Sequence, residues 1–131
     1  MISAKLYMAG GALRLYFLAV DGGSEVRDFL DERSRSPVTA AVASGSIYML
    51  RHLADEGLRG LPASVFKSWR LGGEMFHEIR KGKHRISCFV DPGSILLLTT
   101  TFRTFGRTED FEYARALRLK RTFDSEGTWE D

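Results

Sequence analysis

The chain has 131 residues, of which 44% are hydrophobic and 27% charged, with a formal net charge of +2. This length suits a single domain, and the hydrophobic fraction argues against global disorder. The single cysteine, Cys88, excludes an intrachain disulfide, and the longest apolar runs are too short to span a bilayer. We therefore expect a cytoplasmic protein.

The N-terminal half is predicted to form one strand followed by two helices. The apolar run 13–20 predicts a buried strand, which a glycine-containing turn at 21–23 ends. Ser24 can cap a helix that continues to about residue 34. Ser36-Pro37 is a second helix start, because proline suits the first helical position, and this helix continues to about Glu56. The short link between the two helices predicts a helical hairpin.

The C-terminal half is predicted to form four strands and a helix. Glycine turns separate the strands at about 65–70, 74–81, 84–90 and 94–103, which indicates an antiparallel meander. Glu109-Asp110 then begin a final helix. The predicted class is α+β, with the helical hairpin on one sheet face and the other face partly open. We expect one domain over 1–123 and a flexible acidic tail over 124–131.

Positive charge is concentrated in the second half of the chain. Residues 1–66 carry equal numbers of basic and acidic groups, whereas residues 67–121 carry twelve basic and six acidic groups. The last ten residues carry four acids and no base. The basic segment is typical of a polyanion-binding face, and the acidic tail is a candidate shield for it. The alternative is a basic surface that only keeps the protein soluble.

Two short motifs flank the predicted turn between the second and third strands of the meander. Glu78-Ile79-Arg80 precedes this turn and Arg85-Ile86 follows it. A hairpin symmetric about Gly82-Lys83 places Arg80 directly opposite Arg85, and like charges in that position destabilise a sheet. An anion between them removes this cost, and arginine binds phosphate in a bidentate manner. The alternative is a structural network in which both arginines pair with Glu78.

These motifs, followed by Phe102-Arg103 and Arg107-Thr108, occur in an order that resembles the RelE/ParE toxin superfamily. The resemblance covers about residues 13–122, and the phage-derived, HigB-like branch of type II toxin–antitoxin systems is the most similar. It implies a RelE-like fold and a ribosome-dependent mRNA endonuclease in which the 2′-hydroxyl attacks the phosphodiester. It also implies that no metal or other cofactor is needed, and that the partners are mRNA, the ribosome and a HigA-like helix-turn-helix antitoxin.

The resemblance also implies roles for individual residues. The expected catalytic residues are Arg80, Arg85, Glu78 and His84. The expected RNA-binding residues are Lys81, Lys83, Arg103, Arg107 and Tyr113. For His84 the alternative is an exposed residue of the turn, and for Tyr113 it is core packing of the final helix. The spacing of the histidines and the cysteine indicates no metal site.

One departure from the family pattern leaves other functions open. The family has a lysine pair after the phenylalanine of the last strand, and this chain has Thr104-Phe105 there. This difference favours two alternatives to RNA cleavage. One is a non-enzymatic, ParE-like toxin that binds DNA gyrase, and the other is a decayed prophage relative without activity.

Overall fold

The computed structural model describes residues 1–35, 37, 40–106 and 109–131. Its elements follow one another along the chain as two strands, two helices, four strands, a helix and a short strand. They are β1 (Ile2–Ala9), β2 (Arg14–Val20), α1 (Glu25–Arg35), α2 (Ala40–Glu56), β3 (Phe66–Leu71), β4 (Glu74–Lys81), β5 (His84–Asp91), β6 (Ile95–Arg103), α3 (Asp110–Glu126) and β7 (Thr128–Glu130).

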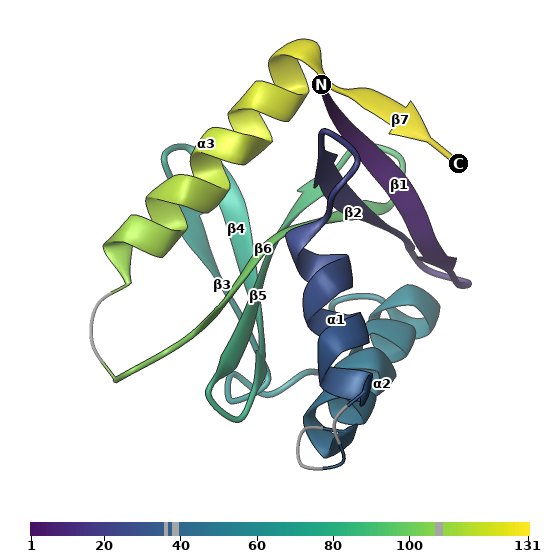
Figure 1. Cartoon of the computed structure of the whole chain (residues 1–131), viewed down its shortest axis with the longest axis vertical. Coiled ribbons are helices and arrows are strands. Elements are labelled where there is room, and N and C mark those ends of the chain that lie inside the picture. Colours follow the sequence, from purple (N-terminus) through teal and green to yellow (C-terminus); the bar gives the residue numbers. More distant parts are fainter. Residues whose placement is uncertain (36, 38–39, 107–108) are drawn as a thin grey trace.

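The strands form one mixed sheet in the order β3-β4-β5-β6-β2-β1-β7, as Figure 1 shows. Strands β3 to β6 are the predicted antiparallel meander, joined by tight turns. β2 pairs in parallel with β6, and it pairs with β1 in the antiparallel direction. The predicted α+β class is therefore confirmed, although the sheet is wider than the sequence indicates.

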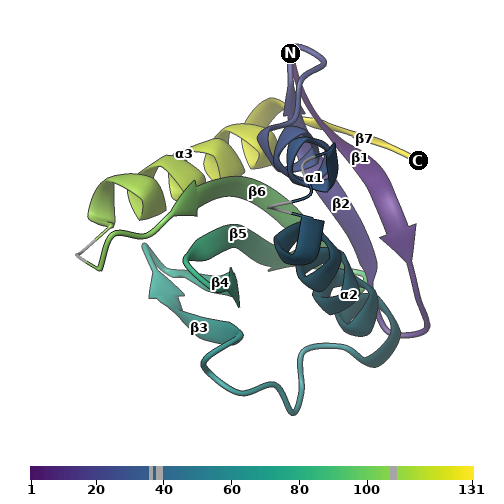
Figure 2. The ribbon, with the colours of Figure 1, turned by 60° about the horizontal axis from the view of Figure 1, so that its bottom comes forward.

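Helices cover both faces of the sheet. α1 and α2 bury one face, where Leu50 and Leu53 pack with Phe17, Ile79 and Leu98. α3 crosses the other face, and Figure 2 shows it on the side of the curved sheet opposite to α2. Burial of these two apolar layers is the main force that holds the helices on the sheet. α3 thus covers part of the face that we expected to be open.

The two outermost strands on one edge, β1 and β7, were not predicted. β1 buries Ile2 and Ala4, and β7 adds to it in parallel at Thr128–Glu130. The ring of Trp129 packs edge-to-face against both Tyr16 and Phe123. Residues 124–131, predicted as a flexible tail, therefore have regular structure, because α3 continues to Glu126 and aromatic packing holds the strand that follows.

The helices agree with the sequence in number but differ in their bounds. α2 begins at Ala40, and Pro37, which was expected at the first helical position, lies in a turn before it. Residues 36 and 38–39 of the predicted helix start lie outside the described residues. α3 continues to Glu126, into the segment 124–131 that the sequence predicts as a flexible tail. Within the described ranges, no helix is both long enough and apolar enough to cross a membrane.

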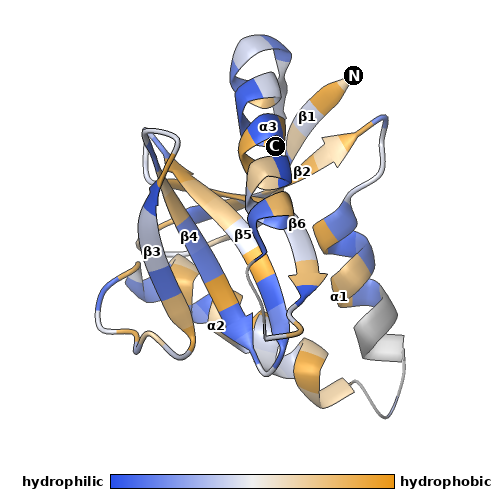
Figure 3. Cartoon of the chain, turned by 90° about the vertical axis from the view of Figure 1, so that its left-hand side faces the viewer, coloured by the Kyte–Doolittle hydropathy of each residue, from blue (hydrophilic) through white to orange (hydrophobic). Residues whose placement is uncertain are grey.

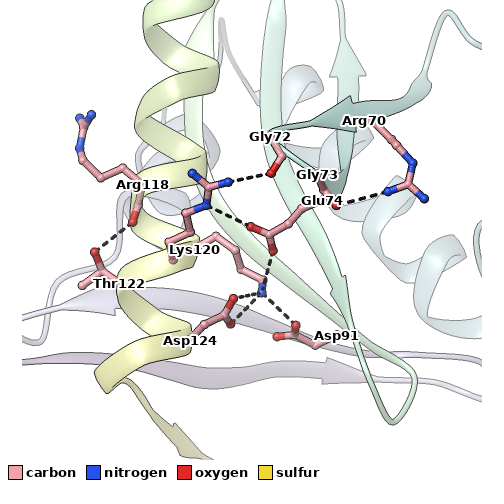
Figure 4. A network of polar contacts seen from close by, with 10 residues as sticks. Arg70, Gly72, Gly73, Glu74, Asp91, Arg118, Lys120, Thr122 and Asp124 are labelled. Carbon is pink, nitrogen blue, oxygen red and sulfur yellow. Dashed lines mark hydrogen bonds and ion pairs between the residues drawn. The ribbon is translucent and has the colours of Figure 1, made fainter.

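A buried lysine fixes α3 to the sheet (Figure 4). Nζ of Lys120 lies 2.7 Å from Asp124 on the same helix, 3.1 Å from Asp91 at the end of β5 and 3.5 Å from Glu74 at the start of β4. Only 3% of Lys120 is exposed. A buried charge is tolerated only when it is paired, so three carboxylates around one ammonium make this contact specific for the observed helix position.

Candidate functional site

The turn between β4 and β5 brings two arginines face to face. Gly82 has a φ of 58°, a conformation that glycine adopts without a steric cost, so two residues suffice to reverse the chain. The resulting register pairs Arg80 with Arg85 and Glu78 with Ser87. The predicted opposition of the two arginines is confirmed, and their side chains share the sheet face on which α3 lies.

Glu78 lies between the two guanidinium groups. Nε of Arg80 donates a hydrogen bond of 2.8 Å to Oε1 of Glu78, and Nε of Arg85 lies 3.6 Å from the same oxygen. Glu78 has no exposed surface, while the side chains of Arg80 and Arg85 are 24% and 15% exposed. One carboxylate thus holds two cations, and the cluster keeps a net positive charge at its solvent side.

The remaining hydrogen-bond capacity of the two arginines differs. Nη1 of Arg85 donates to the carbonyl oxygens of Gly82 and His84, at 2.8 and 3.0 Å, which fixes its guanidinium plane against the turn. In the described part of the chain, Nη2 of neither Arg80 nor Arg85 takes part in a hydrogen bond. These nitrogens can therefore donate to an anion without breaking the contacts that position them.

Arg80 also lines a groove of about 610 Å³ between the edge of the sheet and the first half of α3. The other lining residues come from β3 and α3, namely Lys67, Trp69, Leu71, Asp110, Tyr113, Ala114 and Leu117. Figure 3 shows strongly hydrophilic residues beside hydrophobic ones along β3 and β4. Among the described residues that line it, the groove combines two cations with an aromatic wall, and Asp110 is the single carboxylate.

Tyr113 joins the groove to the core beneath it. Its ring makes edge-to-face contacts with Trp69, Phe76 and Phe102, at centroid distances of 5.1, 5.3 and 6.0 Å. Burial, and after it the negative charge of Glu78, raises the pKa of Tyr113 well above its ordinary value of about 10. The phenol is therefore protonated at neutral pH and can donate a hydrogen bond. Tyr113 therefore packs in the core, which is the alternative that the sequence presents, and because it also lines the groove its role in RNA binding stays a prediction.

The other predicted site residues on the β4–β5 hairpin lie away from the groove. The ring of His84 lies 5.3 Å from that of Phe29 on α1, because neighbouring residues of a strand point to opposite faces. Lys81 also points to the helical hairpin, where its side chain lies over Gly45 of α2 in the space that a larger residue at this position would fill. Lys83 is exposed in the turn.

The predicted residues after β6 are only partly described. Arg103 is exposed at the end of β6, with its Cζ 5.9 Å from the ring centroid of Phe105. Arg107 lies outside the described residues. The structure therefore brings together Arg80, Arg85, Glu78 and Tyr113, and does not bring His84 or Lys81 to them.

Among the charged and aromatic residues of the groove, sequence reasoning missed Lys67, Trp69 and Asp110. Lys67 pairs with Glu78 and Trp69 pairs with Phe76 across the β3–β4 ladder, so they share the face of Arg80. The alternation of these positions along β3 is a signal that the sequence contains. Asp110 is visible only as an acid in the first turn of a helix, because its place at the groove depends on how α3 crosses the sheet.

No known protein-family model matches the sequence, and no curated protein is significantly similar to it. Over the described ranges, no group of three or more histidine, cysteine, aspartate and glutamate side chains is arranged to hold a metal ion. The arginine pair and the groove are therefore the features of the molecule that bear on its function.

Proposed function

We propose that this protein is a toxin of a toxin–antitoxin pair that cleaves mRNA on the ribosome, and that it belongs with the HigB-like branch of the RelE/ParE superfamily. The observation that carries the proposal is the opposed pair of Arg80 and Arg85 beside a groove that also contains Lys67 and Tyr113. Such a cluster of donors suits a phosphodiester and its flanking nucleotides.

The order of the elements supports the same proposal. The α+β class agrees with a RelE-like domain, and β2, α1, α2, β3–β6 and α3 occur in the expected order, whereas β1 and β7 are strands that the expected layout lacks. β1 and β7 add to the sheet at the edge opposite to β3, so they leave the groove unchanged. A fold alone does not establish an activity, and the residues of the groove therefore carry the chemical argument.

In the proposed reaction, the scissile phosphate lies against Arg80 and Arg85. Cleavage by the 2′-hydroxyl forms a bond from the 2′-oxygen to phosphorus and breaks the bond from phosphorus to the 5′-oxygen. The extra negative charge on the phosphorane is the charge that prearranged cations stabilise best. Glu78 orients both guanidinium groups, and its complete burial makes this a positioning role rather than direct contact with RNA.

Two groove residues suit the proton transfers of this reaction. Asp110 is a carboxylate on the groove wall and accepts the proton of the 2′-hydroxyl. Tyr113 lines the groove with its proton in place at neutral pH and donates it to the leaving 5′-oxygen, which becomes strongly basic as its bond to phosphorus breaks. Its raised pKa makes Tyr113 a weaker acid than an ordinary tyrosine, and the positive charge of Arg80 opposes this by stabilising the phenolate. This assignment places the proton transfers on residues that line the same groove as Arg80, and not on His84, whose ring lies against Phe29 of α1.

A second candidate function is suggested by two exposed phenylalanines. Phe105 stands where the family has a lysine, and Phe105 and Phe111 are 75% and 74% exposed. Large exposed apolar side chains are typical of a protein-binding surface. A non-enzymatic, ParE-like toxin that binds gyrase uses such a surface, and it arrests cells through DNA damage rather than through loss of translation.

The test is induced expression in a bacterial host, with primer extension on abundant transcripts. We expect new 5′ ends inside translated regions for the wild type and their loss for Arg80→Ala/Arg85→Ala. Arg80→Lys/Arg85→Lys keeps the positive charge beside Glu78 but lacks the bidentate donors of arginine. We therefore expect this variant to fold normally and to cleave mRNA only weakly. The matched control is Arg59→Ala/Arg118→Ala, which removes two exposed arginines outside the groove.

The outcomes separate the candidate functions. Cleavage that survives in Arg80→Ala/Arg85→Ala overturns the site. Growth arrest with DNA-damage signalling and no cleavage supports the gyrase-binding toxin, and the absence of both arrest and cleavage supports the decayed relative. Co-expression of a neighbouring helix-turn-helix protein is expected to relieve the arrest if that protein is the antitoxin.

A further inference from the structure

One wall of the groove is an aromatic ring with a lysine above it. Trp69 lines the groove from β3, and Nζ of Lys67 lies 5.8 Å from the centroid of its ring. This distance is within the range of a cation–π contact. The lysine thus occupies a position over the ring in the absence of a ligand, and its flexible side chain can move away without disturbing the sheet.

The neighbours of Trp69 hold the ring in place. Phe76 packs on it from β4 at a centroid distance of 4.7 Å, and Tyr113 packs on it from α3 at 5.1 Å with an interplanar angle of 78°. A ring supported from two elements is a rigid platform that loses little conformational freedom when a planar ligand stacks on it. Arg80 lines the same groove, so the platform is next to the proposed phosphate site.

We propose that Trp69 is the stacking platform for an unpaired nucleobase of the RNA, adjacent to the phosphate held by Arg80 and Arg85. This inference rests on the proposed function. The base takes the place of the Lys67 ammonium over the ring, and Lys67 pairs with the neighbouring phosphate. Proteins that bind single-stranded RNA combine such aromatic platforms with basic residues that follow the backbone.

Charge complementarity favours a nucleotide over an apolar ligand. Within the described part of the chain, two lining residues of the groove are cations, Lys67 and Arg80, and one is a carboxylate, Asp110, which lies on the α3 side. An apolar peptide leaves both cations without a counter-charge, whereas a nucleotide offers a flat ring to Trp69 and phosphates to the cations. Double-stranded RNA is excluded as the ligand, since its bases are stacked on one another.

The experiment uses Trp69 as its own reporter. The chain has two tryptophans, so Trp129→Phe leaves Trp69 as the only one and keeps an aromatic ring against Tyr16. The probe is a 2′-O-methyl RNA decamer, which cannot be cleaved by 2′-hydroxyl attack, labelled for anisotropy. We expect saturable quenching of Trp69 emission, and binding about 5- to 100-fold weaker for a decamer in which the nucleotide at the platform is abasic. A series of decamers with the abasic position moved along the strand identifies that nucleotide.

Variants separate stacking from folding and from charge. Trp69→Phe keeps a ring and retains most of the affinity, whereas Trp69→Leu loses about 5-fold or more. Lys67→Ala lowers the slope of log affinity against log salt by about 0.7, the value for one phosphate contact to a single strand. The charge-matched control is Lys5→Ala on β1, at the other end of the sheet, which leaves this slope unchanged.

Failure of this inference is distinguishable from failure of the proposed function. Binding by anisotropy without quenching, and with equal affinity for every abasic decamer, overturns the platform while RNA cleavage stands. Base-dependent quenching by a protein that cleaves no mRNA in cells supports the platform and overturns the endonuclease. The absence of RNA binding by either measurement overturns the platform.

Discussion

Arg80 donates a hydrogen bond of 2.8 Å to Glu78, a carboxylate with no exposed surface. The same oxygen of Glu78 lies 3.6 Å from Arg85, so one buried anion sets the position of both guanidinium groups. Such a buried group is costly unless its partners are in place, and the arginines repel each other unless the carboxylate is between them. The pair is therefore positioned before any ligand arrives.

Replacing Glu78 with glutamine is expected to lower stability and raise affinity for phosphate. The change removes the negative charge but keeps the size of the side chain, and a lost hydrogen bond to a charged group costs about 1.5–3 kcal/mol. The two arginines then lack their common counter-ion and bind an external anion more strongly. Urea unfolding measures the first effect, and the affinity for a 2′-O-methyl RNA measures the second.

The control for Glu78→Gln is Glu130→Gln, which removes an exposed acid on β7 at the far edge of the sheet. We expect this variant to change stability by less than about 0.5 kcal/mol. If Glu78→Gln binds RNA no better than Glu130→Gln does, Glu78 is not the counter-ion that competes with phosphate.

Replacing Lys120 with methionine is expected to loosen α3. The variant leaves Asp91, Asp124 and Glu74 without their common cation, and removing one partner of a buried ion pair costs about 3 kcal/mol or more. Adding Asp91→Asn to Lys120→Met is expected to restore part of the lost stability, because the double variant no longer has the buried negative charge of Asp91. Thermal or urea unfolding of the single and double variants tests this, and an unchanged midpoint for Lys120→Met contradicts it.

The same lysine predicts a stability change at high pH. Although burial opposes the charge, hydrogen bonds to Asp124 and Asp91 raise the pKa of Lys120 above its ordinary value of 10.5. The folded state therefore holds this proton more tightly than the unfolded state does. The contribution of Lys120 is complete below about pH 10.5 and is lost as the pH rises through the folded pKa. The stability difference between wild type and Lys120→Met should shrink over that range.

His77 predicts a change of the opposite sign at mildly acid pH. Burial against the ring of Phe66 lowers the pKa of His77 below 6.5, and its Nδ1 lies 2.6 Å from Oγ of Ser68. The unfolded state then binds more protons, so the neutral histidine stabilises the fold above pH 6.5 and this contribution is lost as the pH falls through the folded pKa. Wild type should lose stability relative to His77→Gln between pH 7.5 and 5.

The control for this pH dependence is His52→Gln on α2, measured over the same range. A difference between wild type and His77→Gln that stays constant with pH contradicts the assignment. A difference that appears equally in His52→Gln indicates a general effect of charge rather than the burial of one ring.

Deleting residues 128–131 is expected to lower stability without exposing the RNA site. The deletion removes the β7 pairing with β1 and the contacts of Trp129 with Tyr16 and Phe123. Burial of an aromatic side chain predicts a loss of about 1–3 kcal/mol. β7 and β3 lie at opposite edges of the sheet, so the acidic tail does not shield the groove. Increased RNA binding by the truncated protein contradicts the expectation that the tail leaves the groove open. Trp129→Ala in the full-length chain measures how much of the lost stability comes from the packing of Trp129 alone.

The sequence contains the local part of the site. Glycine at position 82 predicts the turn, the turn fixes the register, and the register places Arg80 opposite Arg85. Each of these steps involves residues close along the chain, where turn chemistry and alternation decide the geometry. The position of His84 is also determined locally, because neighbouring residues of a strand point to opposite faces and His84 therefore lies on the face opposite to Arg85.

Only the tertiary structure determines what surrounds the arginine pair. Asp110 and Tyr113 reach the groove because α3 crosses one face of the sheet at a particular angle, which the contacts of Lys120 and the packing of Phe123 set. The acidic end of the chain is part of the sheet because β7 pairs with the edge strand β1, which is also a contact between residues far apart in the sequence. Such long-range contacts depend on how whole layers pack, and a sequence read from one residue to the next carries no direct signal for them.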